Sequence, residues 1–206
     1  MDTRQFSKVI LLEETSETSA NTSVGDLDGD CDLDIVLAKG RHWPLHDRVL
    51  LNDGSGIFSD AKNLGDQPDR TYSAVLVDLD QDDDLDVVVS NDSPDKKLIY
   101  INDGQAVFRV AGTWGSPQWN TRNASVADLN GDMNRDGASD IVIGYATAPG
   151  SVFFNKGQGV DFQQVRFGDG KGVVYGIAQG DLNKDGFLDI AVGISDAPNK
   201  VYLSGL

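Results

Sequence analysis

The apolar residues of this chain fall in short runs separated by acidic or Gly-rich turns. Runs of this length that are rich in β-branched residues and bounded by turn residues predict strands. No stretch shows a helical period of apolar positions. We therefore predict an all-β protein. The four clearest runs each begin at an aspartate: Asp34-Ile-Val-Leu, Asp86-Val-Val-Val, Asp140-Ile-Val-Ile and Asp189-Ile-Ala-Val.

Each of these runs follows a ladder of acidic residues at alternate positions. In a tight turn, positions 1, 3 and 5 can direct side-chain oxygens at one centre, position 7 can offer its carbonyl, and position 9 a closing carboxylate. Ca²⁺ binds six to eight oxygen ligands in this way. An EF-hand would need a glutamate at position 12 between two helices. That position holds Leu37, Val89, Ile143 and Val192, so we predict calcium loops between strands.

The sequence thus predicts up to four Ca²⁺ ions. In the third loop two starting points remain open, at Asp128 or at Asp132, because Asp128-Leu-Asn130 begins a ladder four residues early. The predicted ligands of the first two loops are Asp26, Asp28, Asp30, Asp32, Asp34, Asp78, Asp80, Asp82, Asp84 and Asp86. Those of the last two loops are Asp128, Asn130, Asp132, Asn134, Asp136, Ala138, Asp140, Asp181, Asn183, Asp185, Phe187 and Asp189.

Position 6 of the loop distinguishes the four copies. A sharp turn there favours a residue that can adopt a positive φ, and Gly137 and Gly186 meet this need. Cys31 and Asp83 occupy the same position in the first two loops, which instead carry more aspartates. The relative affinities of the four sites are open.

Net charge narrows the range of partners. The chain has 206 residues, 33 acidic residues and a net charge of −16, and fourteen of the acids occupy ladder positions 1, 3, 5 or 9. We expect neither nucleic acid nor an anionic membrane as a partner, since both need clustered Lys and Arg. No apolar stretch is long enough to span a bilayer. We expect an exported, extracellular or cell-surface protein because millimolar calcium is found there, although the chain begins without a signal peptide.

The acidic loop belongs to a longer repeat. The closing aspartates are 52, 54 and 49 residues apart, and about eighteen residues beyond them come turns such as Asn52-Asp-Gly and Asn102-Asp-Gly, a hairpin signal. Four strands per unit predict a β-propeller blade. We treat residues 1–206 as one domain, with repeats at about 13–66, 67–117, 118–170 and 171–206, the last completed by 1–12.

This unit resembles the FG-GAP or VCBS repeat, whose loop is Asp-x-Asp-x-Asp-Gly-x-x-Asp and which carries an Asn-Asp-Gly turn. The resemblance covers nearly the whole chain. It implies a β-propeller with Ca²⁺ in the loops, as in the seven-bladed propellers of integrin α-subunits and certain fungal lectins. It also implies a relation to exported adhesion or carbohydrate-active proteins. The four repeats of this chain leave the size of the ring open.

The two ends of the chain complement each other. The last repeat ends before its fourth strand, and the opening run from Gln5 to Leu12 matches the fourth strands of the other repeats. An N-terminal strand that completes the last blade leaves no open sheet edge. Within one chain this produces a four-bladed ring, and between two chains an eight-bladed homodimer. Four blades of a longer ring are a third alternative.

A candidate ligand face lies opposite the calcium loops. If the strands alternate in direction, the loops on that side hold all three tryptophans, and exposed aromatic rings beside Arg and Asp suit a glycan or protein ligand. The alternative is that these rings only pack the loops against the blades. The candidate ligand residues are His42, Trp43, His46, Arg70, Tyr72, Trp114, Trp119, Arg122 and Tyr175.

The favoured function is a calcium-binding, lectin-like binding or adhesion module. One alternative is a carbohydrate-active lyase or hydrolase that uses His42 and His46, since histidine titrates near neutral pH. No nucleophile elbow, phosphate loop or dinucleotide motif supports an enzyme, and we assign no catalytic residue. Another alternative is a purely structural domain that assembles with copies of itself.

Overall fold

The computed structural model describes residues 8–129 and 137–205. Within these residues the regular secondary structure consists of strands, so the all-β prediction is confirmed. The strands form four antiparallel sheets, each built from strands that are consecutive in the sequence. Each sheet has the meander topology expected of a blade.

The first strand of each sheet leads into an acidic loop, and the second strand begins at the closing aspartate. The first sheet contains β1 (Ser19–Gly25), β2 (Asp34–Lys39), β3 (Arg48–Leu51) and β4 (Asp60–Asn63). The second contains β5 (Thr71–Val77), β6 (Asp86–Asn91), β7 (Lys97–Ile101) and β8 (Arg109–Trp114). The third contains β9 (Thr121–Ala127), β10 (Asp140–Tyr145), β11 (Gly150–Asn155) and β12 (Phe162–Phe167). The fourth contains β13 (Val173–Gly180), β14 (Asp189–Ser195) and β15 (Lys200–Tyr202).

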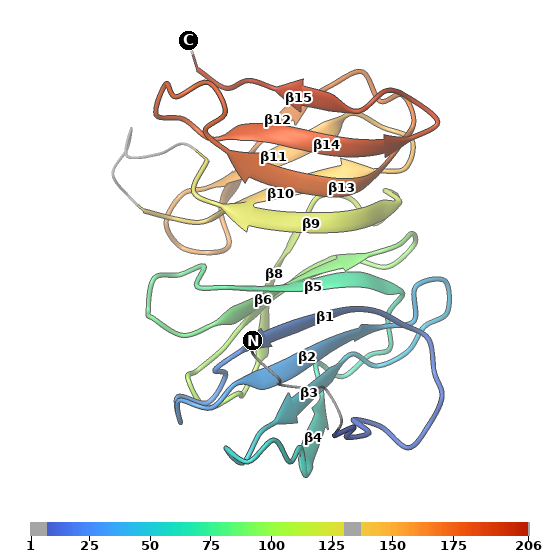
Figure 1. Cartoon of the computed structure of the whole chain (residues 1–206), viewed down its shortest axis with the longest axis vertical. Helices are drawn as coiled ribbons and strands as arrows, with labels where there is room; N and C mark the ends of the chain where they lie inside the picture. Colours follow the sequence, from blue (N-terminus) through green and yellow to red (C-terminus); the bar gives the residue numbers. More distant parts are fainter. Residues whose placement is uncertain (1–7, 130–136, 206) are drawn as a thin grey trace, which may run out of the picture.

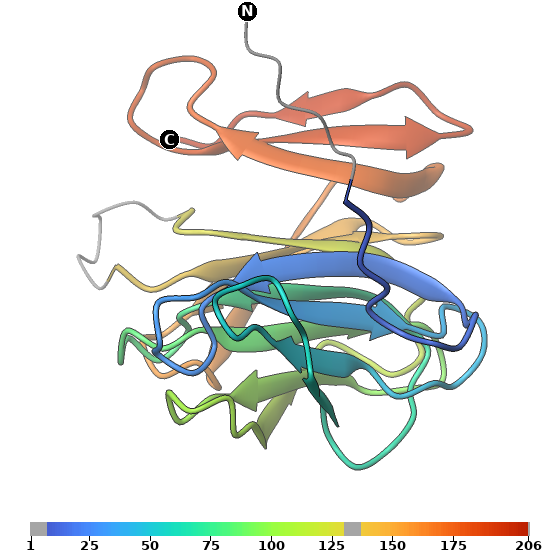
Figure 2. The same cartoon turned by 60° about the horizontal axis from the view of Figure 1, so that its bottom comes forward.

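The four sheets lie face to face in a row (Figure 1). Strand β1 packs against β5, β5 against β9, and β9 against β13. The second strands of the two middle sheets, β6 and β10, are fully buried because one face of each packs toward the preceding sheet and the other toward the following sheet. Three apolar clusters accordingly fill the three spaces between neighbouring sheets. The sheet β13–β15 is the outermost layer at one end of the row (Figure 2).

The N-terminal segment differs from its predicted place. Residues Lys8–Leu12 form no strand, and the described part of the last sheet has three strands. The cause is the buried ammonium group of Lys39 at the end of β2, which binds Glu17 at 2.8 Å and also Glu13. Two ion pairs to a fully buried lysine hold this segment against the first sheet. Closure of a ring within one chain is therefore not seen.

Candidate metal centres and the opposite face

The closing aspartate of each loop is fully buried and accepts two backbone hydrogen bonds. In the first sheet the Oδ2 of Asp34 accepts the N–H of Leu27 at 2.9 Å, and its Oδ1 accepts the N–H of Asn52 at 2.8 Å. The carboxylate thus joins the acidic loop to the turn that follows the third strand. The same pair of bonds recurs at Asp86 with Leu79 and Asn102, at Asp140 with Leu129 and Asn155, and at Asp189 with Leu182 and Ser204.

Sequence reasoning assigned these aspartates only as ligands and missed this structural role. The signal available in the sequence was the nearly constant interval between each closing aspartate and the following Asn-containing turn. That interval reflects the hydrogen bond between the two, since a buried carboxylate needs donors from the backbone around it.

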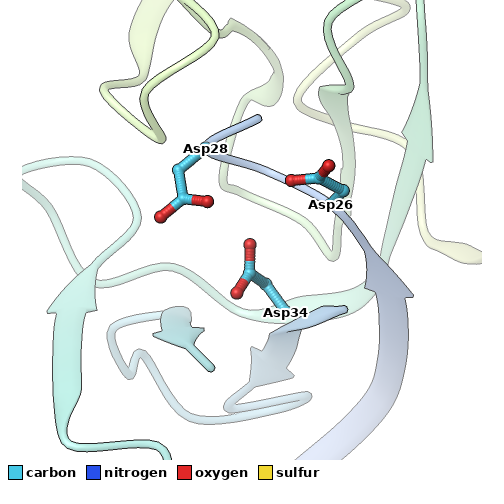
Figure 3. A group of neighbouring side chains, drawn as sticks. All are labelled: Asp26, Asp28 and Asp34. Carbon is cyan, nitrogen blue, oxygen red and sulfur yellow. The ribbon is translucent and has the colours of Figure 1, made fainter. Parts of the chain in front are cut away.

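The first two acidic loops each gather three carboxylates. Oxygen atoms of Asp26, Asp28 and Asp34 all lie within 4.8 Å of one another and point toward a common space (Figure 3). The group Asp78, Asp80 and Asp86 repeats this arrangement in the second sheet. These are ladder positions 1, 3 and 9. The remaining side chains of the ladders, those of Asp30, Asp32, Asp82 and Asp84, lie outside the two groups.

The chemistry of these groups fits a hard divalent cation. The Oδ1 atoms of Asp28 and Asp80 are buried and have no hydrogen-bond partner. Burial, assisted by neighbouring carboxylates, raises the pKa of both side chains. A buried, unpartnered carboxylate oxygen is costly, and a calcium ion would satisfy it together with the oxygens at positions 1 and 9. These residues would therefore hold Ca²⁺ and keep both loops folded.

The turn at position 6 has a left-handed backbone, as its sequence position predicts. Cys31 has φ 70°, Asp83 φ 71°, Gly137 φ 61° and Gly186 φ 91°. Each of these residues lies three places before its closing aspartate. The first two loops therefore carry backbone strain that the glycines of the last two avoid.

Replacing Asp83 by glycine is expected to stabilise the cation-free protein by about 0.5–1 kcal/mol, because a non-glycine residue is strained at positive φ. The side chain of Asp83 is exposed, so the change removes no packing. Urea unfolding in EDTA measures the effect. Asp83→Ala is the matched control, since it removes the same charge but keeps a Cβ at positive φ; an equal gain from both variants would assign the effect to charge.

In the third loop, the earlier of the two possible starting points, Asp128, is equivalent in position to the first aspartate of the first loop. The N–H of Leu129 bonds Oδ2 of Asp140 at 2.9 Å, as Leu27 bonds Asp34. Asp128 therefore takes the place of Asp26, and the loop is four residues longer than the others. Ala138 is buried. The other predicted ligands of this loop, Asn130, Asp132, Asn134 and Asp136, lie outside the described residues.

Like the first two loops, the fourth loop is closed by hydrogen bonds from its own backbone to its first aspartate. Both oxygens of Asp181 accept backbone N–H groups, from Asp185 at 3.1 Å and from Gly186 at 3.0 Å. The amide of Asn183 donates to Oδ2 of Asp185 at 2.8 Å. An asparagine at position 3 thus donates a hydrogen bond to a neighbouring carboxylate, whereas Asp28 and Asp80 at the same position each leave an oxygen unsatisfied. Phe187, predicted to offer its carbonyl, donates its N–H to Oδ1 of Asp185.

Comparison with known families agrees with the repeated geometry. The model of the FG-GAP-like repeat matches residues 26–89 and 132–192, more than half of the chain. The chain belongs to the FG-GAP-like repeat family. The two matched regions begin at Asp26 and at Asp132. The second match thus starts at the later of the two ladder positions of the third loop, whereas the hydrogen bond of Leu129 to Asp140 aligns Asp128 with Asp26. No curated protein matches the chain. Across the described residues, no helix is long and apolar enough to cross a membrane.

At the end of each FG-GAP-like sheet opposite its acidic loop, the innermost strand contains a β-bulge. The register shifts between Ser19 and Asn21, between Thr71 and Ser73, at Thr121–Asn123, and between Val174 and Gly176. A bulge redirects the side chain of the extra residue. The extra residues are Ala20, Tyr72, Arg122 and Tyr175, three of which are candidate ligand residues.

Two of these bulge residues, Tyr72 and Arg122, form a polar cluster with His42 of the β2–β3 loop. The guanidinium of Arg122 lies 4.4 Å from the ring centroid of Tyr72 and pairs with Asp92 at 3.1 Å. The hydroxyl of Tyr72 lies 3.0 Å from Nε2 of His42. Arg70 pairs separately with Asp95 at 2.9 Å. Trp43 is 70% exposed and Tyr175 is 58% exposed, so both rings are open to a ligand.

Trp114 and Trp119 are placed differently from their prediction as ligand residues. Trp114 is the last residue of β8, is buried, and meets the ring of Phe153 edge-on at 5.5 Å. Trp119 is half-buried and rests on Tyr145 at 5.0 Å. Both rings belong to the cluster between the second and third sheets. Both large rings thus take part in the packing between blades, and a ligand role for these two tryptophans stays a prediction.

The two histidines have different surroundings. His42 contacts Tyr72 in the polar cluster, whereas His46 lines a recess of about 550 Å³ with Leu12, Glu13 and Lys39. Its Nδ1 atom is buried without a hydrogen-bond partner. A joint catalytic role for both side chains gains no support from this arrangement.

Asp47 fixes the loop that carries Trp43. Its Oδ1 accepts the N–H of Lys39 at 2.7 Å. The hydroxyl of Thr71 lies 2.8 Å from both Asp47 Oδ2 and Asn91 Oδ1, and one proton cannot serve two acceptors. Burial raises the pKa of Asp47 to about 7, so a protonated Asp47 can donate to Thr71 while Thr71 donates to Asn91. This network ties the β2–β3 loop to the second sheet.

Proposed function

We propose that this protein is a calcium-stabilised β-propeller module that binds a glycan through the face opposite its acidic loops. The stacked sheets act as blades, and Ca²⁺ bound at the first two loops holds their ends together. The observation that carries the proposal is the alignment of bulge residues, which brings Tyr72, Arg122 and Tyr175 to one end of the inner strands. The recurrence of a bulge at the same place in the first strand of each sheet favours a functional use.

The chemistry of this face suits a sugar. The exposed rings of Trp43 and Tyr175 offer flat apolar surfaces for the C–H face of a sugar ring. The paired charges of Arg122 and Asp92 lie beside Tyr72 and His42 on the same face and can hydrogen-bond hydroxyl groups. FG-GAP-like repeats are typical of extracellular proteins, and we propose that this module is exported and acts in adhesion.

Glycan-array binding in calcium tests the proposal. We expect Trp43→Ala and Tyr175→Ala each to weaken binding about two- to tenfold, since stacking on an aromatic ring contributes roughly 0.5–1.5 kcal/mol to such a contact. Ile57→Ala is the control, because Ile57 is similarly exposed in the turn at the opposite end of the blades. Silence across neutral and acidic glycans would reject the sugar ligand. Binding to a panel of purified extracellular proteins would then point to a protein ligand.

A further inference from the structure

The space between neighbouring sheets is filled in the same way three times. In each sheet the second and fourth residues after the closing aspartate face the following sheet, together with the third-strand residue paired to the first of them. A Cβ on Gly144 would collide with Val174 of the next sheet. All three sets are buried. They are Val36, Ala38 and Val49, then Val88, Ser90 and Ile99, then Val142, Gly144 and Val152.

The same three positions are uncovered in the last sheet. They hold Ala191, Gly193 and Val201, of which Val201 is 51% exposed and Gly193 is exposed. These residues line an open recess on the outer face of β13–β15. They have the small apolar character of the covered sets, although this face has no following sheet in the described chain.

The leucine at position 2 of the acidic loop is likewise buried in the first three sheets and exposed in the last. It is 1% exposed at Leu27, 0% at Leu79 and 6% at Leu129, where it inserts beside the next sheet, but 57% exposed at Leu182. The carbonyl of Leu27 accepts the side-chain amide of Asn102 at 2.8 Å, and that of Leu79 accepts Asn155 at 2.9 Å. Leu27 and Leu79 are thus each held by the Asn-containing turn of the following sheet.

The first sheet carries the matching half of this contact. Asn52 occupies the position of Asn102, and its Nδ2 donates to Leu33 O at 3.2 Å, as Asn102 donates to Leu85 O at 3.2 Å. A side-chain amide has two N–H donors, and Asn102 uses Leu27 O as well. On the same side, Val24 and Leu33 are exposed, whereas their counterparts Leu76 and Leu85 pack against the preceding sheet.

The N-terminal segment lies along this side of the first sheet. Leu12 lines the recess beside Leu50, and Ile10 Cδ1 lies 3.9 Å from where a Cβ of Gly56 would stand. Val9 and Leu11 are exposed.

We propose that a second copy of this chain covers the outer face of β13–β15 and the exposed acidic-loop end of the first sheet, where Val24 and Leu33 lie. Leu182 and Val201 of one copy pack against Val24 and Leu33 of the other, and Asn52 of the other donates to the Leu182 carbonyl. The occupant is a second copy because the two free faces are the two halves of an interface that the chain already forms three times. Two such head-to-tail contacts close a ring of eight blades. This inference rests on the proposal that the sheets are propeller blades.

Sedimentation in excess CaCl₂ over a range of protein concentrations tests it. We expect twice the chain mass of 22.1 kDa for the unaltered chain. Leu182→Asp and Val201→Arg should each weaken the dimer at least tenfold. Val110→Arg is the matched control, because Val110 is 56% exposed on β8 and should leave the dimer intact. A single-chain mass, a dimer that survives both variants, or a concentration-dependent filament would overturn the proposal.

A cross-link provides a second readout. Asn52→Cys combined with Leu182→Cys in a Cys31→Ser background should form a covalent dimer upon oxidation, and either new cysteine alone should not. Equal cross-linking by the single variants would reject the predicted contact. Failure of glycan binding by a dimer would reject the binding function alone, while glycan binding by a monomer would reject the dimer alone.

Discussion

Removal of calcium with EDTA is expected to lower the melting temperature by about 10–20 °C. Each site contributes about 2.7 kcal/mol at a hundredfold excess of ion over its dissociation constant, and the first two loops gather their carboxylates into suitable groups. A domain of this size loses about 2–4 °C per kcal/mol. Without the ion, the carboxylates of Asp28 and Asp80 repel their neighbours, so the acidic loops between the first and second strands of these sheets loosen.

Calorimetry with and without EDTA measures this effect. Asp80→Asn should reduce the calcium-dependent part of the shift, because the buried oxygen of Asp80 loses its charge. Asp66→Asn is the control, since Asp66 is an exposed acid in the β4–β5 loop and should leave the shift unchanged. Return of the melting temperature upon addition of CaCl₂ but not of an equal concentration of MgCl₂ would identify the ion. Identical melting temperatures in EDTA and CaCl₂ would show that the acidic ladders are turns that bind no stabilising ion.

Asp86→Ala is expected to cost about 3–5 kcal/mol of stability, even without calcium. The substitution leaves the N–H groups of Leu79 and Asn102 without their acceptors, and both groups lie in the tightly packed space between sheets. An unpaired buried donor costs about 1–3 kcal/mol. The loss of the carboxylate also removes a calcium ligand. The difference in stability between the variant and the unaltered protein should therefore be larger in CaCl₂ than in EDTA.

Urea unfolding in EDTA separates the two roles of Asp86. Asp84→Ala is the matched control, because Asp84 belongs to the same ladder but is only partly buried, and within the described residues its side chain accepts no backbone hydrogen bond like those of Asp86. A loss in EDTA confined to Asp86→Ala supports the hydrogen-bonding role. Equal stability of the two variants in EDTA would show that Asp86 acts only through the metal.

Local sequence patterns determined the repeat, the strands and the position of the acidic loops. These patterns are the alternation of apolar and polar residues, the β-branched runs and the turn residues. Each acts over a few neighbouring residues, so the strands of a repeat can be predicted from that repeat alone. The left-handed turn at Cys31 and Asp83 was foreseeable for the same reason, because the glycines at the equivalent positions reveal the backbone requirement.

Tertiary structure alone decided which residues meet across sheets. The burial of Trp114, the docking of the N-terminal segment on Lys39, and the earlier start of the third loop at Asp128 all depend on contacts between distant parts of the chain. The cluster of Tyr72 with Arg122 depends on bulges in two different sheets. Such contacts follow from how side chains fill the space between layers, and a linear pattern of residue types does not encode that packing.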